Sequence, residues 1–177
     1  VWTTVHTSVS THPTPHARPD VYLNGVRITN SKSLTGANTP SFSIGGGMEL
    51  GTATGYVGNV YVASSTFTGN QAPGFGGLRI SNALGVTLKS VSVTNNTATG
   101  AYNSNSALSS GFGGGAYVNN AGTVSIAQSN FDNNIAGRGD AGLGIQSVSG
   151  VYLTDVTANG NTVNANNAAS SIYYGRS

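Results

Sequence analysis

Charged residues are scarce in this chain of 177 residues, and cysteine is absent. Lys, Arg, Asp and Glu make up 7% of the sequence, whereas they make up about 25% of an ordinary soluble domain. The net charge is only +2, and the few cations are scattered along the chain. Because there is no basic run, the sequence offers no electrostatic basis for binding nucleic acid. The lack of cysteine excludes disulfide bonds.

Long hydrophobic runs are absent as well. No apolar stretch is long enough to cross a bilayer and no signal peptide is recognisable, so we expect no membrane span. A composition rich in Ser, Thr, Asn and Gly fits a secreted, extracellular or cell-surface protein better than a cytosolic enzyme. Since the chain begins at Val1 and not at methionine, we expect a processed form or a part of a longer protein.

An internal repeat dominates what is present. Its frame is V-x-[LVI]-x-x-[VS]-x-[FVIA]-x-x-[NS], in which apolar residues alternate with polar ones. The five copies begin at Val21, Val60, Val86, Val124 and Val151. A short glycine-led strand precedes four of the copies, at 46–50, 76–80, 114–118 and 142–145, and the serine-led segment 171–174 occupies the same place at the C-terminus. A repeat of this length with period-two alternation predicts a β-solenoid.

Four copies of the frame end in asparagine, and the first ends in Ser31. The asparagines are Asn70, Asn96, Asn134 and Asn161. Like residues of stacked repeats form columns with a step of ~4.8 Å, so these side chains are expected to form a structural asparagine ladder from repeat to repeat. An alternative is that asparagine is used here because it tolerates a left-handed turn.

The spacing of the repeats alternates. Successive copies begin 39, 26, 38 and 27 residues apart, so the structural unit is a pair of repeats. Most of the extra length follows the asparagine position, at 32–45 and 97–113. We therefore expect long loops on alternate coils, projecting from one side, where solenoids often bind their partners.

Residues 1–20 differ from the rest and are interpreted as a Thr/Ser/Pro/His-rich cap or linker before a solenoid that occupies 21–177. The prolines of this segment exclude a central strand. His6, His12 and His16 match no structural zinc spacing, and we expect no metal and no cofactor.

Two elements of the repeat resemble a known family. Phe67-x-x-Asn70 and Phe131-x-x-Asn134 are similar to the F-x-x-N element of polymorphic outer membrane protein repeats, and Gly114-Gly115-Ala116 resembles their G-G-A element. More broadly, the frame is similar to right-handed parallel β-helix repeats of the pectin-lyase-like class. The resemblance implies that fold over roughly 21–174 and an adhesin-like role at a cell surface.

The acidic residues give little support for an enzyme. Polysaccharide lyases and hydrolases of the pectin-lyase-like class need clustered carboxylates. The chain has only five acidic residues, Asp20, Glu49, Asp132, Asp140 and Asp155, and of these Glu49, Asp132 and Asp155 fall in three different columns on different coils. We expect no catalytic residue, and a polysaccharide-binding or polysaccharide-cleaving protein remains the alternative function.

Several surface features carry weaker hypotheses. Tyr22, Tyr61, Tyr117 and Tyr152 fall at outward positions and could stack on sugars, although β-propensity explains them equally. Glu49 and Arg79 share a column, which predicts an exposed ion pair.

Two short motifs complete the candidates. Arg138-Gly139-Asp140 is an RGD tripeptide in an expected turn, similar to integrin-binding motifs. Asn95-Asn96-Thr97 is an N-glycosylation sequon, with Asn95 as the acceptor.

The sequence therefore predicts an all-β protein: a right-handed parallel β-helix (β-solenoid) of about five coils with long loops on alternate coils. The expected function is that of an extracellular structural or adhesive rod, or filament component, that presents Ser/Thr/Asn/Gly-rich loops. Expected partners are a further solenoid end, by self-association or continuation, and carbohydrate or a cell-surface protein. The final strand at 171–174 has no following copy of the frame, so it exposes groups that invite another strand.

Overall fold

The structure, a computed structural model, describes residues 18–33, 46–51, 55–100, 111–164 and 172–175. Within these ranges the chain forms β-strands and turns and no helix. All pairs of strands are parallel. The expected all-β class is therefore confirmed.

The strands are short in the first repeats and long in the last. They are β1 (Val21–Asn24), β2 (Arg27–Thr29), β3 (Met48–Leu50), β4 (Val57–Ala63), β5 (Thr66–Thr68), β6 (Gln71–Ala72), β7 (Leu78–Lys89), β8 (Ser92–Thr94), β9 (Thr97–Ala98), β10 (Ala116–Asn130), β11 (Ile135–Ala136), β12 (Leu143–Thr157), β13 (Thr162–Val163) and β14 (Ile172–Gly175). A ten-stranded sheet and a four-stranded sheet contain all of them.

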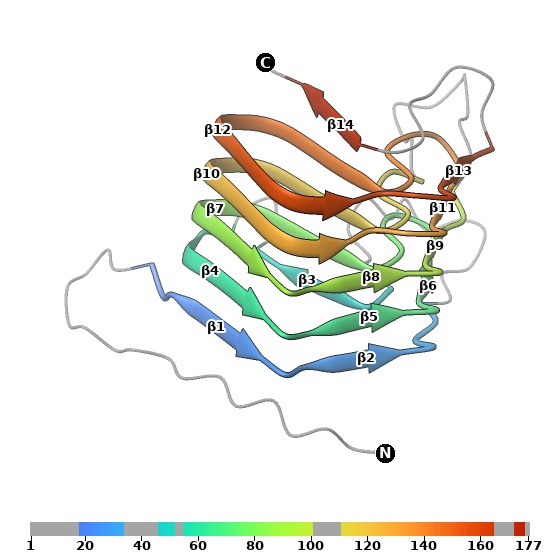
Figure 1. The fold of residues 1–177 in the computed structure, drawn as a ribbon, viewed down its shortest axis with the longest axis horizontal. Coiled ribbons are helices and arrows are strands. Elements are labelled where there is room, and N and C mark those ends of the chain that lie inside the picture. The colour runs from blue at the N-terminus through green and yellow to red at the C-terminus, as the bar shows by residue number, and fades with distance from the viewer. Residues whose placement is uncertain (1–17, 34–45, 52–54, 101–110, 165–171, 176–177) are drawn as a thin grey trace.

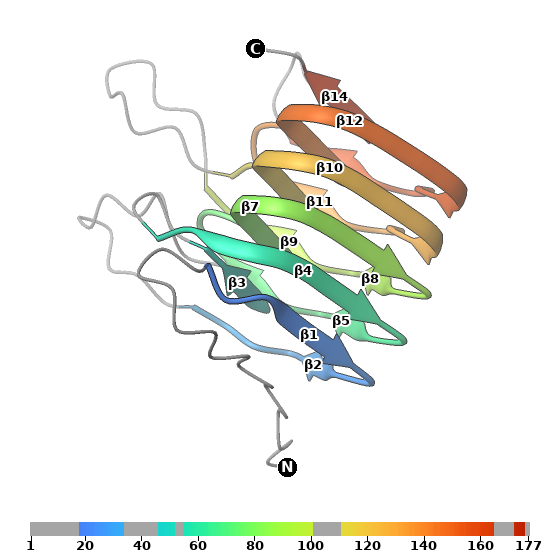
Figure 2. The same ribbon diagram turned by 90° about the vertical axis from the view of Figure 1, so that its left-hand side faces the viewer.

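The five copies of the frame, numbered repeats 1 to 5 from Val21, lie side by side in one register. Val21 pairs with Val60, Val60 with Val86, and the column continues through Val124 to Val151. Figures 1 and 2 show the resulting row of strands, from β1 through β4, β7 and β10 to β12. The chain then bends, and β2, β5 and β8 form a second row of the same curled sheet. The period-two frame fixes this register, because a slip of one residue would turn the apolar side chains outward.

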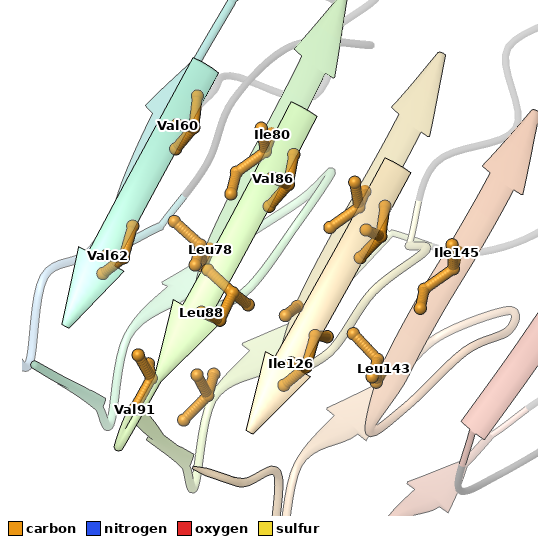
Figure 3. Packing of buried hydrophobic residues seen from close by; sticks show 14 of the residues in the cluster. Val60, Val62, Leu78, Ile80, Val86, Leu88, Val91, Ile126, Leu143 and Ile145 are labelled. Carbon is orange, nitrogen blue, oxygen red and sulfur yellow. The ribbon is translucent and has the colours of Figure 1, made fainter. Parts of the chain in front are cut away.

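The core is built from the inward columns of the repeats. Figure 3 shows Val60, Val86, Val62, Leu88 and Ile126 projecting between the strands toward Leu78, Ile80, Leu143 and Ile145 of the glycine-led strands. The two phenylalanines of the frame, Phe67 and Phe131, are completely buried beside Val93. Each repeat thus packs chiefly on its two neighbours, an arrangement compatible with a β-solenoid.

The structure differs from the sequence-based expectation in how the strands divide. The glycine-led strand and the V-x-L strand were expected as two separate strands, but they form one bent strand in β7, β10 and β12. The bend falls at residues with positive φ, namely Asn82, Asn120 and Ser147. A single left-handed residue turns the chain without ending the pairing on either side.

A second difference is the small sheet formed by β6, β9, β11 and β13. Its two-residue strands come directly after the asparagine turn, where only loops were expected. Most of both expected loops, at 34–45 and 101–110, and the segment 1–17 with its three histidines lie outside the described residues.

Candidate functional site

The asparagine column is the most regular polar feature of the molecule. The side-chain Nδ2 atoms of Asn70, Asn96 and Asn134 donate to the Oδ1 atom of the next asparagine at 3.0, 3.1 and 3.2 Å. The same Oδ1 atoms accept the backbone N–H of the preceding asparagine at 2.9–3.0 Å. Asn70, Asn96 and Asn134 are 0% exposed. Buried amides with every group paired stabilise the stack and leave nothing for a ligand.

The left-handed turn involves a different residue. Positive φ occurs one position earlier, at Asn30, Gly69, Asn95, Asn133 and Gly160. The ladder asparagines themselves are not among the residues with positive φ. Asparagine at the last position of the frame therefore serves the hydrogen bonds, and the preceding residue provides the turn.

A serine column was missed by the sequence reasoning. Ser65 Oγ accepts the backbone N–H of Val26 and Ser129 Oγ accepts that of Val91, both at 3.1 Å. Each hydroxyl in turn donates to a carbonyl two residues earlier. The signal was present in the frame, where serine and valine alternate at this position with the same two-repeat period as the loops.

The outward face of β1 and β4 carries exposed tyrosines. The rings of Tyr22 and Tyr61 stack with centroids 4.7 Å apart and planes 5° apart. Tyr22 also donates to Asp20, and partial desolvation together with the Asp20 carboxylate raises the pKa of the Tyr22 phenol. Farther along this column lie the smaller Thr87 and Ser125, and then the exposed Tyr152.

Tyr117, the fourth tyrosine expected on the outside, is buried. Its ring stacks on Phe75 with centroids 5.0 Å apart, and Phe112 lies beside it at 6.3 Å. Its hydroxyl donates to Gln146 Oε1 at 2.5 Å. The two phenylalanines lie outside the frame, so the repeat pattern alone could not predict that they cover this position.

Arg79 is buried in the same cluster. Glu49 and Arg79 form the expected ion pair, but the pair is not exposed, since the side chains retain only 19% and 10% of their accessible surface. The guanidinium carbon of Arg79 lies 4.6 Å from the centre of the Phe75 ring. Arg79 Nε is buried and has no hydrogen-bond partner, which makes the cation–π contact its main compensation on that side.

The RGD tripeptide lies against this cluster. Asp140 is 6% exposed, has a φ of 56° and approaches Tyr117 and Gly144. Burial raises the pKa of the Asp140 carboxyl to about 6. Gly139 is buried, and Arg138 lies over the Phe112 ring at 4.7 Å. In this structure the tripeptide therefore does not display its carboxylate on the surface.

The remaining carboxylates have separate local roles. Asp20 accepts hydrogen bonds from the backbone and side chain of Asn59, and Asp132 accepts one from the backbone of Asn159 at 2.7 Å. Asp155 occupies an exposed left-handed corner. No group of three or more metal-ligating side chains occurs within the described ranges.

Asn95, the sequon asparagine, is exposed at a left-handed turn, whereas its neighbour Asn96 belongs to the ladder.

In the part of the chain that the structure describes, no helix could span a membrane. Comparisons with protein-family models, with curated proteins and with solved structures found no match to this chain.

Proposed function

We propose that this chain is an extracellular structural or adhesive segment: a rigid right-handed parallel β-helix that presents loops from alternate coils. The observation that supports this most strongly is the unbroken register of five repeats, with an asparagine column running along four of them. Nearly all buried polar groups serve the stack. A protein whose buried hydrogen bonds hold repeat to repeat is suited to act as a rod.

The contacts between repeats favour a rigid rod. Each repeat packs its apolar side chains chiefly against its neighbours, and the Oδ1 atoms of the asparagine column accept hydrogen bonds across every interface between successive repeats. Such a stack lengthens by a fixed step for every repeat added. The similarity of the F-x-x-N and G-G-A elements to polymorphic outer membrane protein repeats supports a place at the cell surface.

The rod is tested by duplicating one two-repeat unit. Insertion of a second copy of residues 86–150 is expected to lengthen the particle by about 10 Å, two strand spacings, at unchanged cross-section. Small-angle X-ray scattering measures both quantities. A flexible Gly/Ser insert of equal length is the control, and a duplicated unit that behaves like this control would refute the rod.

The surface location is tested in the cells that make the protein. An antibody against the folded chain is expected to label intact cells or the medium. Labelling that requires permeabilised cells would contradict the proposed location.

The tyrosine column favours polysaccharide binding as a second candidate. Tyr61 turns one ring face to Tyr22, and the small Thr87 and Ser125 leave room beside it. Tyr152 follows three repeats away from Tyr61, about 14 Å along the stack. Exposed aromatic rings beside hydroxyl groups can stack on pyranose rings.

Affinity electrophoresis in gels containing neutral or acidic polysaccharide tests this candidate. Retardation should be lost in Tyr61→Ala and Tyr152→Ala and retained in Tyr56→Ala, which removes an exposed tyrosine outside the column. Release of unsaturated products that depends on Asp132 or Asp155 would instead indicate a polysaccharide-cleaving enzyme.

A further inference from the structure

The two ends of the described stack are buried to different extents. At repeat 5, Leu153 is 41% exposed, whereas Leu88 and Ile126 of the same column are 0% and 1% exposed. Val151, Val156 and Ala158 of repeat 5 are also only partly buried. At repeat 1, Val21 and Ile28 are also partly buried, but Leu23 and Val26 are only 3% and 7% exposed. The apolar edge available for another strand is therefore at the C-terminal end.

This edge also carries donors that are paired everywhere else in the stack. In repeats 2 to 4 the asparagine donates its backbone N–H and its Nδ2 to the Oδ1 atom of the following repeat. Asn161 has no such acceptor among the described residues, and its Nδ2 donates only to the Phe131 carbonyl at 2.8 Å. Asn161 is partly exposed, unlike the other three asparagines.

Val156 provides the second unmet donor. Val26 and Val91, at the same position of the frame, donate their backbone N–H to the serine hydroxyl of the following repeat. No described residue accepts from Val156. Repeats 1, 3 and 5 have valine at this position and are called the valine type, whereas repeats 2 and 4 have serine and are called the serine type. Repeat 5 is of the valine type, so a serine-type segment would supply the acceptor for its Val156 N–H.

The edge lacks the usual protection against strand addition. Exposed edges are commonly blocked by lysine, proline or inward charges. Residues 148–157 contain one charge, Asp155, which lies at a corner. Strand β14 pairs with β12 only from Leu143 to Gln146, and among the described residues no other strand pairs with this edge of β12 (Figures 1 and 2).

We propose that the open edge of β12 and β13 binds one further parallel strand-turn-strand segment of the serine type, with the pattern V-x-[IL]-x-x-S-x-F-x-x-N. The serine hydroxyl accepts from Val156, the asparagine Oδ1 accepts from Asn161, and the apolar residues cover Leu153. This goes beyond a rod function, because it names the sequence that the rod end selects. A second copy of this chain fits less well, since its repeat 1 has Val26 and Ser31 at these positions and its Leu23 is already buried.

The test uses a fluorescent peptide with the sequence of residues 122–136, the serine-type segment of repeat 4. Titration with the full chain should give a saturable rise in anisotropy. Peptides carrying Ser129→Val or Asn134→Ala should bind about tenfold more weakly, as the loss of one acceptor for a buried donor implies. Equal binding of the three peptides would overturn the proposed selectivity.

The binding surface is tested on the protein. Leu153→Lys places a charge on the open edge and should abolish binding, whereas Tyr152→Lys, one residue away on the outward face, should not. Both positions are exposed, so both variants should fold. Binding that survives Leu153→Lys would place the peptide elsewhere and refute the proposal.

A tethered segment removes the entropy cost that a free peptide must overcome. Gly175 of β14 pairs with Gln146 of β12, which pairs with Asn119 of β10. Continued by three residues, this register puts a residue added after Ser177 in the column of Gly122. Residues 122–136 appended there should raise the unfolding midpoint of the chain, and the same extension with Ser129→Val and Asn134→Ala should raise it less. If neither the free peptide nor the tethered segment shows this preference, the proposal is wrong, while the scattering test of the rod is unaffected.

Discussion

At the scale of single residues, this protein uses side-chain amides and hydroxyls where other folds use charges. Three of the four ladder asparagines, Asn70, Asn96 and Asn134, are completely buried, and each is hydrogen-bonded to the next asparagine of the ladder. A buried donor or acceptor that loses its partner costs about 1–3 kcal/mol. The ladder is therefore sensitive to single substitutions.

Asn96→Ala should lower the free energy of unfolding by about 2–4 kcal/mol. The change removes the acceptor for the backbone N–H and the Nδ2 of Asn70, and the donor to the Phe67 carbonyl. Urea unfolding followed by circular dichroism measures the loss. Asn95→Gly is the matched control, because Gly69 and Gly160 occupy the same left-handed position in other repeats. An equal loss in both variants would contradict a role for the ladder.

Asp140 makes stability depend on pH. Its pKa is about 6 in the folded protein because it is buried, and about 4 in an unfolded chain. The folded state therefore retains a proton that the unfolded state has released between these values, so stability falls as the pH rises from about 4 through about 6. We expect a loss of about 2 kcal/mol, allowing for partial solvent contact.

Asp140→Asn should remove this loss and stabilise the protein at pH 7. Asparagine tolerates the left-handed conformation at this position. Thermal unfolding at pH 4, 5, 6 and 7 gives the comparison, with Asp155→Asn, at an exposed left-handed corner, as the control. An unchanged slope in Asp140→Asn would assign the pH dependence to another group.

At the scale of elements, the glycine-led strands pack closer to their neighbours than any side chain allows. A Cβ atom on Gly115 would collide with the Gly142 carbonyl oxygen and with the side-chain amide of Asn134. Gly77 and Gly47 meet the corresponding groups in the repeats before. The paired glycines therefore let the bent strands approach the asparagine column.

Gly115→Ala should destabilise the protein by at least about 2 kcal/mol, because the clash is with backbone and with the ladder. Gly150→Ala is a fair comparison, since its nearest contact would be Tyr152 Cε2 at 3.7 Å. Differential scanning calorimetry of both variants provides the test. Similar midpoints for the two would show that the backbone can relax around Gly115.

At the scale of the whole molecule, the alternation of serine and valine requires that valine-type and serine-type repeats follow each other in turn along the stack. Valine-type repeats donate to serine-type repeats, as Val26 does to Ser65 and Val91 to Ser129. Removal of one internal repeat brings two repeats of the same type together. Removal of a pair does not.

Deletion of residues 124–150 should place repeat 5 on repeat 3 and leave the Val91 N–H without an acceptor. The added change V156S should restore the acceptor and recover about 1–3 kcal/mol. Chemical unfolding of the deletion with and without V156S measures the difference. V156S in the full chain is the control, and a gain of equal size there would argue against an effect of the alternation.

The sequence by itself determined the register of the repeats and the asparagine column. Both follow from the period-two frame, because only one alignment buries the apolar residues of all five copies together. The frame also contained the serine column, visible as an alternation of serine with valine.

Only the tertiary structure decided which outward residues are buried. Phe75 and Phe112 lie outside the frame, yet they cover Tyr117 and contact Arg79 and Arg138. Their positions depend on where the chain returns after each asparagine turn, which no local pattern encodes. The sequence predicted an exposed strand at the C-terminal end, but only the structure decided which part of β12 is left uncovered, because β14 pairs with it only from Leu143 to Gln146.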